Sequence, residues 1–476
     1  MLPNTHEKEA AAPENRHGDT PEAQTRMLDA GLLKQLQNQF QKRGENHLAL
    51  NAVTQTAVQE VALRREKVIE LQHPVSHKLD TWSATNQKAS GRCWFFAGLN
   101  LLRPATMRKL HLKEFEFSQN WTLFWDKLER ANHFLENIID TASRELDERT
   151  VTHLLKSPIG DGGQWHMFVD IVDKYGLVPK AHMPETVSSS RTGPMNKHLN
   201  LILRRGARDL RKQTGGAEAN ERDTLDSKIQ KQKTSILEAV YRVLCIHLGE
   251  PPNRFDFQWR DKDNQFHREE GLTPKAFAEN YVEQDLNEYV CLVNDPREGH
   301  PTNHTYTVER LGNVVGGSQV LYLNVAVDVM KEAALRTILD GEPVWMGCAV
   351  GETFHRNKGL WDPHLYDFEA LYGMDMSFSK ADRLAYGHAA MSHAMLFTGA
   401  DVIAEEPHPR ARTWRVENSW GEQGGEKGFY TMSDAWFDEH VYEIAVHRRY
   451  LSEELIAATK QEPTVLPPWD PMGALA

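Results

Sequence analysis

The segment "WFFAGLNLLRPATMRKL" (94–110) constrains the fold most, because its first half is apolar on nearly every side. A helix without a polar face must be surrounded by protein, so the segment predicts a helix buried in the middle of a lobe. Pro104 is expected to kink or end that helix. Cys93 directly precedes the segment, where a glycine-containing loop gives way to it. A lone cysteine at such a place is more often a packing residue than a nucleophile.

A nucleophilic role for Cys93 requires a lowered pKa, a base, a group that orients the base, and donors for an oxyanion. The free N–H groups and the dipole at a helix start favour a thiolate. Gln87 lies six residues before Cys93, in the preceding loop. Its amide and the Cys93 backbone N–H are the expected pair of oxyanion donors.

The base is expected from the last part of the chain. His393, in "MSHAMLFTG", lies at the mouth of a segment with β character, and Asn418 follows 25 residues later, a distance that suits an adjacent strand. An Asn carbonyl that accepts the imidazole N–H fixes the tautomer and aims the other ring nitrogen at the sulfur. Trp420 is expected to cover that hydrogen bond.

The length of 476 residues exceeds what a single core supports, so two or more lobes are expected. A net charge of −12 argues against a surface built mainly for nucleic acid. The four cysteines form no CxxC pair and indicate free thiols in a reducing compartment. With no apolar signal segment at the N-terminus, we expect a cytoplasmic protein.

The secondary-structure signals predict an α+β chain, mainly helical first and β-rich last. The expected parts are a disordered polar tail (1–26), an N-terminal helical segment (27–72), a helical lobe with Cys93 (73–194), a large helical insertion (195–339), a β-rich lobe with His393 and Asn418 (340–455), and a C-terminal arm (456–476). Within the insertion, 195–245 is expected to form a helical hairpin around "TGGAEAN". The proline-rich end is expected to be extended and stiff.

In this order, "QKASGRCW", "SHAMLFTG" and "VENSWGE" resemble the motifs of papain-like cysteine peptidases. Ser90 stands where secreted members carry a cysteine, and 300 residues separate Cys93 from His393, about twice the usual spacing. Over about 28–476 the chain resembles the bleomycin hydrolase and aminopeptidase C family. The motifs that carry this resemblance are "FEFSQNW", "DGGQWHM", "CLVNDPR", "YTVERLGNVVGG", "EPVWMGCAVG" and "LPPWDPMGALA".

The resemblance implies a papain-like two-lobe fold, a helical lobe beside a β-barrel-like lobe, and a cysteine aminopeptidase. It assigns catalysis to Cys93, His393 and Asn418 and the oxyanion site to Gln87. It also implies that Gly162 and Gly163 line the substrate, where only glycine permits close backbone approach. The arm is expected to return to the cleft and to bring the carboxylate of Ala476 to the substrate amine. A homohexamer that acts on peptides, and on bleomycin's amide, is implied as well, with no metal or organic cofactor and no membrane.

Two other functions remain open at this point. Residues 201–234 hold nine Lys and Arg against five Asp and Glu, which allows a nucleic-acid-binding scaffold with incidental peptidase activity, although a solvated helical face is the simpler explanation. A cysteine nucleophile forms a thioester with the acyl group of its substrate, and transfer of that group to an amine instead of water would make the protein an acyltransferase. On composition alone, the last residues would be a frayed terminus.

Overall fold

The computed structural model describes residues 28–79, 82–214, 222–404 and 408–475, without the side chains of 222–225. The expected disordered tail therefore lies outside the described residues, as does Ala476. The chain forms two compact units, one of residues 1–63 with 366–376 and the other of residues 64–365 with 377–476. Among the residues that the structure describes, no helix combines the length and hydrophobicity that crossing a bilayer requires.

The smaller unit consists of short helices: α2 (Ala30–Lys42), α3 (Gly44–Val53), α4 (Val58–Ala62) and α15 (Phe368–Tyr372). Asp29 caps α2, because its carboxylate accepts the N–H of Leu32 at 2.7 Å. Helix α2 lies within the segment 27–72, for which the sequence predicts helical structure. Its apolar side chains are exposed, and none of its residues is buried.

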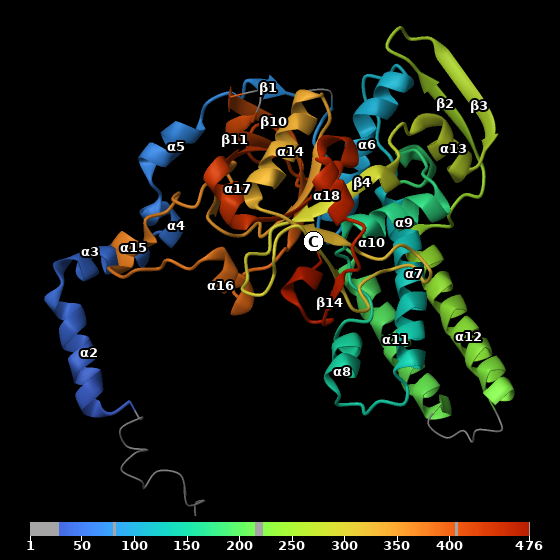
Figure 1. Cartoon of the computed structure of the whole chain (residues 1–476), viewed down its shortest axis with the longest axis horizontal. Helices are drawn as coiled ribbons and strands as arrows, with labels where there is room; N and C mark the ends of the chain where they lie inside the picture. The colour runs from blue at the N-terminus through green and yellow to red at the C-terminus, as the bar shows by residue number, and fades with distance from the viewer. Residues whose placement is uncertain (1–27, 80–81, 215–221, 405–407, 476) are drawn as a thin grey trace, which may run out of the picture. The chain divides into compact units, whose positions relative to one another are not determined.

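The larger unit is built around one mixed sheet of twelve strands (Figure 1). The order along its main path is β14, β5, β6, β4, β13, β7, β10, β11, β12, β9, β8, and β1 pairs with β10. The central strands bear the site: β7 (Val344–Cys348), β10 (His393–Ala404), β11 (Arg410–Glu417) and β13 (Val441–His447). The other strands are β1 (His77–Lys78), β4 (Tyr289–Val293), β5 (His304–Val308), β6 (Tyr322–Asn324), β8 (Phe354–His355), β9 (Leu360–Trp361), β12 (Phe429–Ser433) and β14 (Thr464–Leu466).

Helix α6 (Cys93–Lys109) is the buried helix that the sequence predicts: every residue from Cys93 to Met107 is buried. It continues through Pro104 to Lys109, so of the two effects expected of this proline, ending the helix is wrong, and a kink stays a prediction. The helices that share its core include α7 (Gln119–Asp140), α8 (Arg149–Lys156), α9 (Trp165–Tyr175) and α13 (Pro274–Tyr281). Helix α5 (Arg65–Leu71) contacts β12, and α10 (Val187–Ser190) contacts α12 (Arg222–Leu248).

Alternate residues of the central strands face two different hydrophobic cores. Trp345 and Ala394 belong to the core that includes α6, whereas Met346 and Met395 belong to the core under α14 (Val327–Leu339). This alternation follows from the period of two in a strand. Helices α16 (Lys380–Ala385), α17 (Asp434–His440) and α18 (Glu453–Ala458) complete this part. Strands β7 to β13 lie in the last part of the chain, where the sequence predicts β structure, and the sheet has one face toward the helix that begins with Cys93.

The insertion differs from its prediction in its second half. Helices α11 (Gly193–Thr214) and α12 (Arg222–Leu248) form the expected hairpin and extend beside α7 (Figure 1). Beyond Leu248, however, come the two-stranded ribbon β2 (Phe255–Arg260) with β3 (Phe266–Leu272), and then β4, β5 and β6 of the main sheet. Strand β4 pairs with β13 and β5 with β14, each about 150 positions later in the chain, so the local sequence contains little sign of them. Strands β2 and β3 pair with each other across a short turn, and the sequence did not predict them either. The terminal arm likewise contains a strand, β14, which pairs in parallel with β5.

Candidate active site

Cys93 is the first residue of α6, and its side chain is almost fully buried, with 2% of the residue exposed. The sulfur accepts backbone N–H groups from Ala394 and Trp94. Ala394 directly follows His393 on β10, so this contact joins the start of α6 to the strand that carries the histidine. The first-turn amides of α6 have no acceptor within the helix, and therefore point toward the sulfur and the space beside it.

Burial raises the pKa of the Cys93 thiol to about 11, although the amides of Ala394, Trp94 and Cys93 itself act to lower it. The Asp161 carboxylate adds to the increase. This direction is opposite to the lowered pKa that the helix start predicted. The helix dipole was readable from the sequence, but the loss of water around the thiol depends on the packing of the whole lobe.

His393 begins β10, and Asn418 directly follows β11, the antiparallel neighbour of β10. The two side chains are joined by a hydrogen bond of 2.9 Å between His393 Nε2 and Asn418 Oδ1. Asn418 thus accepts from Nε2, which leaves Nδ1 as the ring nitrogen for the thiol proton. Burial lowers the pKa of His393 to about 4, and the bond to Asn418 acts to raise it. The ring of Trp420 lies 5.1 Å from the His393 ring, centroid to centroid, and its cover over this hydrogen bond stays a prediction.

Proton transfer from Cys93 to His393 forms both charges together, and opposite charges attract strongly away from water. The amides at the start of α6 favour the thiolate, and Asn418 favours the imidazolium. Such a site can transfer a proton from the thiol to the imidazole while the sulfur attacks. The thiolate and the imidazolium then form together, and neither has to be stable without the other.

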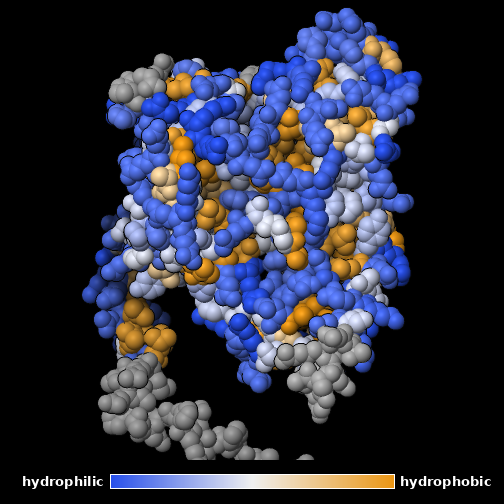
Figure 2. Space-filling view, turned by 45° about the vertical axis from the view of Figure 1, so that its right-hand side comes forward, coloured by the Kyte–Doolittle hydropathy of each residue, from blue (hydrophilic) through white to orange (hydrophobic). Residues whose placement is uncertain are grey.

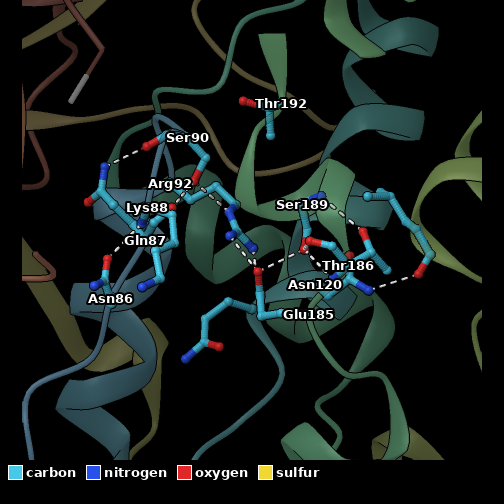
Figure 3. A network of polar contacts seen from close by, with 12 residues as sticks. Asn86, Gln87, Lys88, Ser90, Arg92, Asn120, Glu185, Thr186, Ser189 and Thr192 are labelled. Atoms are coloured by element: carbon cyan, nitrogen blue, oxygen red, sulfur yellow. Dashed lines mark hydrogen bonds and ion pairs between the residues drawn. The ribbon is translucent and has the colours of Figure 1, made fainter. Parts of the chain in front are cut away.

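The loop before Cys93 is fixed by hydrogen bonds at both ends (Figure 3). The Gln87 side-chain Nε2 donates to Ser90 O at 2.6 Å, and the Ser419 hydroxyl donates to Gln87 Oε1 at 2.5 Å. One of the two Nε2 hydrogens is used by Ser90, so the other is available to an oxyanion. Arg92 holds the far end through a bidentate pair with Glu185, at 2.8 and 2.7 Å. Ser419 and Glu185 were not identified from the sequence, because neither lies in a motif with a catalytic spacing.

Asp161 is the most connected residue that sequence reasoning missed. Its carboxylate accepts the Gly91 N–H at 3.1 Å, the Asn196 amide at 2.6 Å, the Lys127 ammonium at 2.6 Å and the Thr192 hydroxyl. Burial alone would raise its pKa, but Lys127 and these donors hold the pKa of Asp161 well below the usual 3.8. Because Gly91 lies two residues before Cys93, this carboxylate fixes the nucleophile loop. In the sequence, the one sign of this role was that Asp161 directly precedes the glycine pair Gly162 and Gly163.

The glycine pair has a packing role in addition to the expected one. A Cβ on Gly163 would lie 2.4 Å from the indole ring of Trp94, the residue after Cys93. The indole N–H in turn donates to Asp161 O at 2.7 Å. Glycine at 163 is thus required for contact with Trp94, whatever lies in the cleft. The neighbouring Gly162 carbonyl accepts from Arg130.

The C-terminal arm reaches this glycine loop. Gln164, the residue after Gly163, donates its side-chain amide to Ala474 O at 2.5 Å. Ala476, expected to carry the anchoring carboxylate, lies outside the described residues, and the described chain stops one residue short of it. Leu475, the last described residue of the arm, lines a cavity of about 320 Å³ together with Gly160 and Arg130.

The basic hairpin uses much of its charge within the protein. Arg204 donates to Leu155 O and Lys156 O, and Arg211 donates to Thr141 O. Lys233 forms an ion pair with Glu136 of α7. These contacts tie α11 and α12 to the rest of the lobe and leave fewer cations for phosphate groups than the sequence suggested.

A buried thiol at the start of a helix that contacts β10, and a hydrogen-bonded His–Asn pair on β10 and at the end of β11, are the arrangement expected of a papain-like cysteine peptidase. Residues 27–473 match the Peptidase C1-like family. The chain is 47% identical over 408 residues to aminopeptidase C of Listeria monocytogenes serovar 1/2a, covering 86% of this chain and 90% of that protein. It is 43% identical over 438 residues to human bleomycin hydrolase, covering 90% and 94%.

The crystal structure of PepW from Lactobacillus rhamnosis HN001 superposes with a TM-score of 0.91 at 42% identity, covering 95% of this chain and 100% of that one. The chain therefore belongs to the Peptidase C1-like family, and it is a cysteine peptidase of the aminopeptidase C and bleomycin hydrolase type. The resemblance found in its sequence motifs is confirmed.

Proposed function

We propose that this enzyme removes N-terminal residues from peptides with Cys93 as nucleophile. The observation that carries the proposal is the His393–Asn418 hydrogen bond at 2.9 Å, beside a sulfur that accepts the amide of Ala394. Cys93 attacks the first peptide carbonyl and gives its proton to His393. Gln87 and the Cys93 N–H stabilise the oxyanion. His393 then protonates the leaving amine, and water releases the acyl group with His393 as base.

The arm is the proposed source of exopeptidase specificity. Its path to Gln164 supports a position of the Ala476 carboxylate in the cleft, two residues beyond Ala474. At neutral pH a terminal carboxyl is anionic and a peptide amine is mostly protonated. A charge-assisted hydrogen bond of about 1.5–3 kcal/mol would favour free over blocked N-termini by about 10- to 150-fold. Gly162, Gly163 and Trp420 complete the substrate-facing set.

Three further properties belong to the same proposal. The named relatives include bleomycin hydrolases, which supports hydrolysis of bleomycin's amide by this enzyme. The exposed apolar side chains of α2 and its unit support association of copies, for which we propose a homohexamer (Figure 2). Free thiols at all four cysteines suit a reducing, cytoplasmic location. Functionally, we divide residues 73–476 into a Cys93 lobe (73–194), an insertion (195–339), a β-rich lobe (340–455) and the arm (456–476).

Paired peptides that differ only in N-terminal acetylation test this function. The wild-type enzyme should cleave the free peptide and lose activity after iodoacetamide modifies Cys93. Cys93→Ala should abolish turnover, whereas Cys245→Ala, at a half-buried cysteine of α12, serves as the matched control. Near-wild-type turnover by Cys93→Ala would refute the nucleophile assignment. Transfer of the acyl group to an added amine in excess of hydrolysis would instead identify an acyltransferase.

A further inference from the structure

Two sequence motifs to which the mechanism gives no role meet beneath the C-terminal arm. "NDPR" (294–297) follows β4, and "WDPM" (469–472) lies in the arm. The Arg297 guanidinium binds both oxygens of the Asp470 carboxylate, with Nη1–Oδ2 at 3.1 Å and Nη2–Oδ1 at 2.8 Å. Asp470 is the only charged side chain in residues 464–475, so this pair is the one ionic attachment available to a side chain of that segment.

Arg297 is itself held in place from the sheet side. Asp295 accepts its Nε at 2.9 Å and its Nη2 at 2.7 Å. The loop that carries both residues is tied to the end of β6 by Asn324, whose Oδ1 accepts the Asp295 N–H at 2.9 Å and whose Nδ2 donates to Asp295 O at 3.1 Å. The orientation of the guanidinium is therefore fixed by Asp295 and the end of β6, independently of its contact with the arm.

Asp470 transmits that orientation to the last residues. Its Oδ1 also accepts the Met472 N–H at 2.9 Å, which starts the short 3-10 turn Pro471–Gly473. The hydroxyl of Tyr322 donates to Met472 O at 3.2 Å, and Gln164 fixes Ala474 O. From Asp470 onward each attachment lies within two residues of the next, so the direction of the chain toward Ala476 is set at Asp470.

Burial and charge make this attachment sensitive to substitution. The side chains of Asp295, Asp470 and Arg297 are only 3%, 9% and 13% exposed. Two carboxylates share one guanidinium, and without Arg297 they would repel each other with little water between them. Bidentate Arg–carboxylate geometry also fixes angle as well as distance, which a single ammonium group does not.

We propose that the Arg297–Asp470 pair is the positioning device of the C-terminal arm and determines how strongly the enzyme prefers free over blocked N-termini. This rests on the proposed aminopeptidase function. Neither residue touches the substrate: Arg297 holds Asp470, and Asp470 aims the residues that follow it into the cleft. Loss of the pair leaves the chemistry at Cys93 intact and releases the group that selects the substrate amine.

The test compares the ratio of kcat/KM for free and acetylated forms of one peptide in the full-length enzyme. Asp470→Asn removes the charge but keeps an oxygen for the Met472 N–H, so the turn is preserved. Arg297→Lys keeps the charge but loses the bidentate geometry. Glu462→Gln, an exposed carboxylate earlier in the arm, is the matched control. Both variants of the pair should lower the ratio by about tenfold or more, with a raised KM for the free peptide, while the control leaves it unchanged.

Three readouts separate a specific effect from a structural one. The rate of iodoacetamide modification of Cys93 and the melting temperature should stay close to wild type in Asp470→Asn. In a double-mutant cycle, Arg297→Gln together with Asp470→Asn should lower the ratio no further than either change alone. An unchanged ratio in folded Asp470→Asn and Arg297→Lys enzymes would overturn the positioning role.

Deletion of Ala476 distinguishes this inference from the function on which it rests. If the deletion lowers the ratio and Asp470→Asn does not, amine anchoring stands and the positioning role is wrong. If Asp470→Asn lowers the ratio and the deletion does not, the pair positions an arm that acts by filling the cleft, and the carboxylate anchor is wrong. If neither changes the ratio, both are wrong.

Discussion

Asp161→Asn should lower both the free energy of unfolding and the kcat of this enzyme, although Asp161 takes no direct part in the proposed reaction. Four donors converge on the two carboxylate oxygens: the Gly91 N–H, the Thr192 hydroxyl, the Lys127 ammonium and the Asn196 amide. Asparagine keeps one acceptor oxygen and turns an NH₂ group toward donors. The substitution therefore leaves at least two donors without acceptors and removes the only counter-charge within salt-bridge distance of Lys127 among the described residues.

The size of the effect follows from the burial of Lys127. Its side chain has no exposed surface, and that of Asp161 is 13% exposed. Removing one partner of a buried ion pair costs about 3–5 kcal/mol, because the other charge stays buried without compensation. The loop from Gly91 to Cys93 loses its attachment at the same time, and a displacement of about 1 Å near reacting groups can reduce the rate by about a hundredfold.

Urea unfolding and peptide turnover measure these two effects. We expect the free energy of unfolding to fall by about 3–5 kcal/mol and kcat to fall by about a hundredfold. Asp147→Asn, at an exposed carboxylate, should change neither quantity. Adding Lys127→Met to Asp161→Asn removes the stranded ammonium and should restore part of the stability but not the rate. A loss of less than about 1 kcal/mol in Asp161→Asn would refute the reasoning.

The same carboxylate also contributes to the pH dependence of stability. Because the folded-state pKa of Asp161 is depressed, its contribution is present above the unfolded value near 3.8 and is lost as pH falls below it. The difference in free energy of unfolding between wild type and Asp161→Asn should therefore become smaller as the pH is lowered below about 4. A constant difference between pH 7 and pH 3 would show that the charge of Asp161 does not carry the effect.

Three other predictions concern the reacting groups. Asn418→Ala should lower kcat by about 10- to 100-fold with little change in KM, because it removes the group that fixes the His393 tautomer; an unchanged kcat would deny Asn418 this role. Gln87→Ala should lower kcat by about 100- to 1000-fold by removing an oxyanion donor, and Ser419→Ala, which frees Gln87 Oε1, should lower it less. The rate at which iodoacetamide modifies Cys93 should be half-maximal near pH 4, because burial lowers the pKa of His393 to about 4. In Asn418→Ala this midpoint should move to lower pH, because the hydrogen bond from Asn418 acts to raise the pKa of His393. A midpoint near pH 6.5 would show that the imidazole is solvated.

The sequence predicted the parts of the site that depend on local pattern. The apolar segment after Cys93 predicted α6, and the spacing of His393 and Asn418 suited two neighbouring strands, as β10 and β11 are. It did not predict the direction of the Cys93 pKa shift. The helix start acts locally and lowers the pKa, whereas burial by distant segments raises it and is the larger effect.

The misses at β14, at Asp161 and at the Arg297–Asp470 pair share one physical cause, which is pairing between segments far apart in the chain. Strand β14 has three residues and pairs with β5 some 158 positions earlier, so its own composition shows no strand period. Asp161 lies in a motif that by itself predicts a tight turn, and its role appears only when Gly91 and Lys127 are brought to it. Arg297 and Asp470 were likewise parts of two separate motifs, and only the fold shows that one binds the other. Because Arg297 of one motif binds Asp470 of the other, a single ion pair explains why each motif carries its charged residue. Substitution of either residue should therefore cause the same loss of preference for free N-termini.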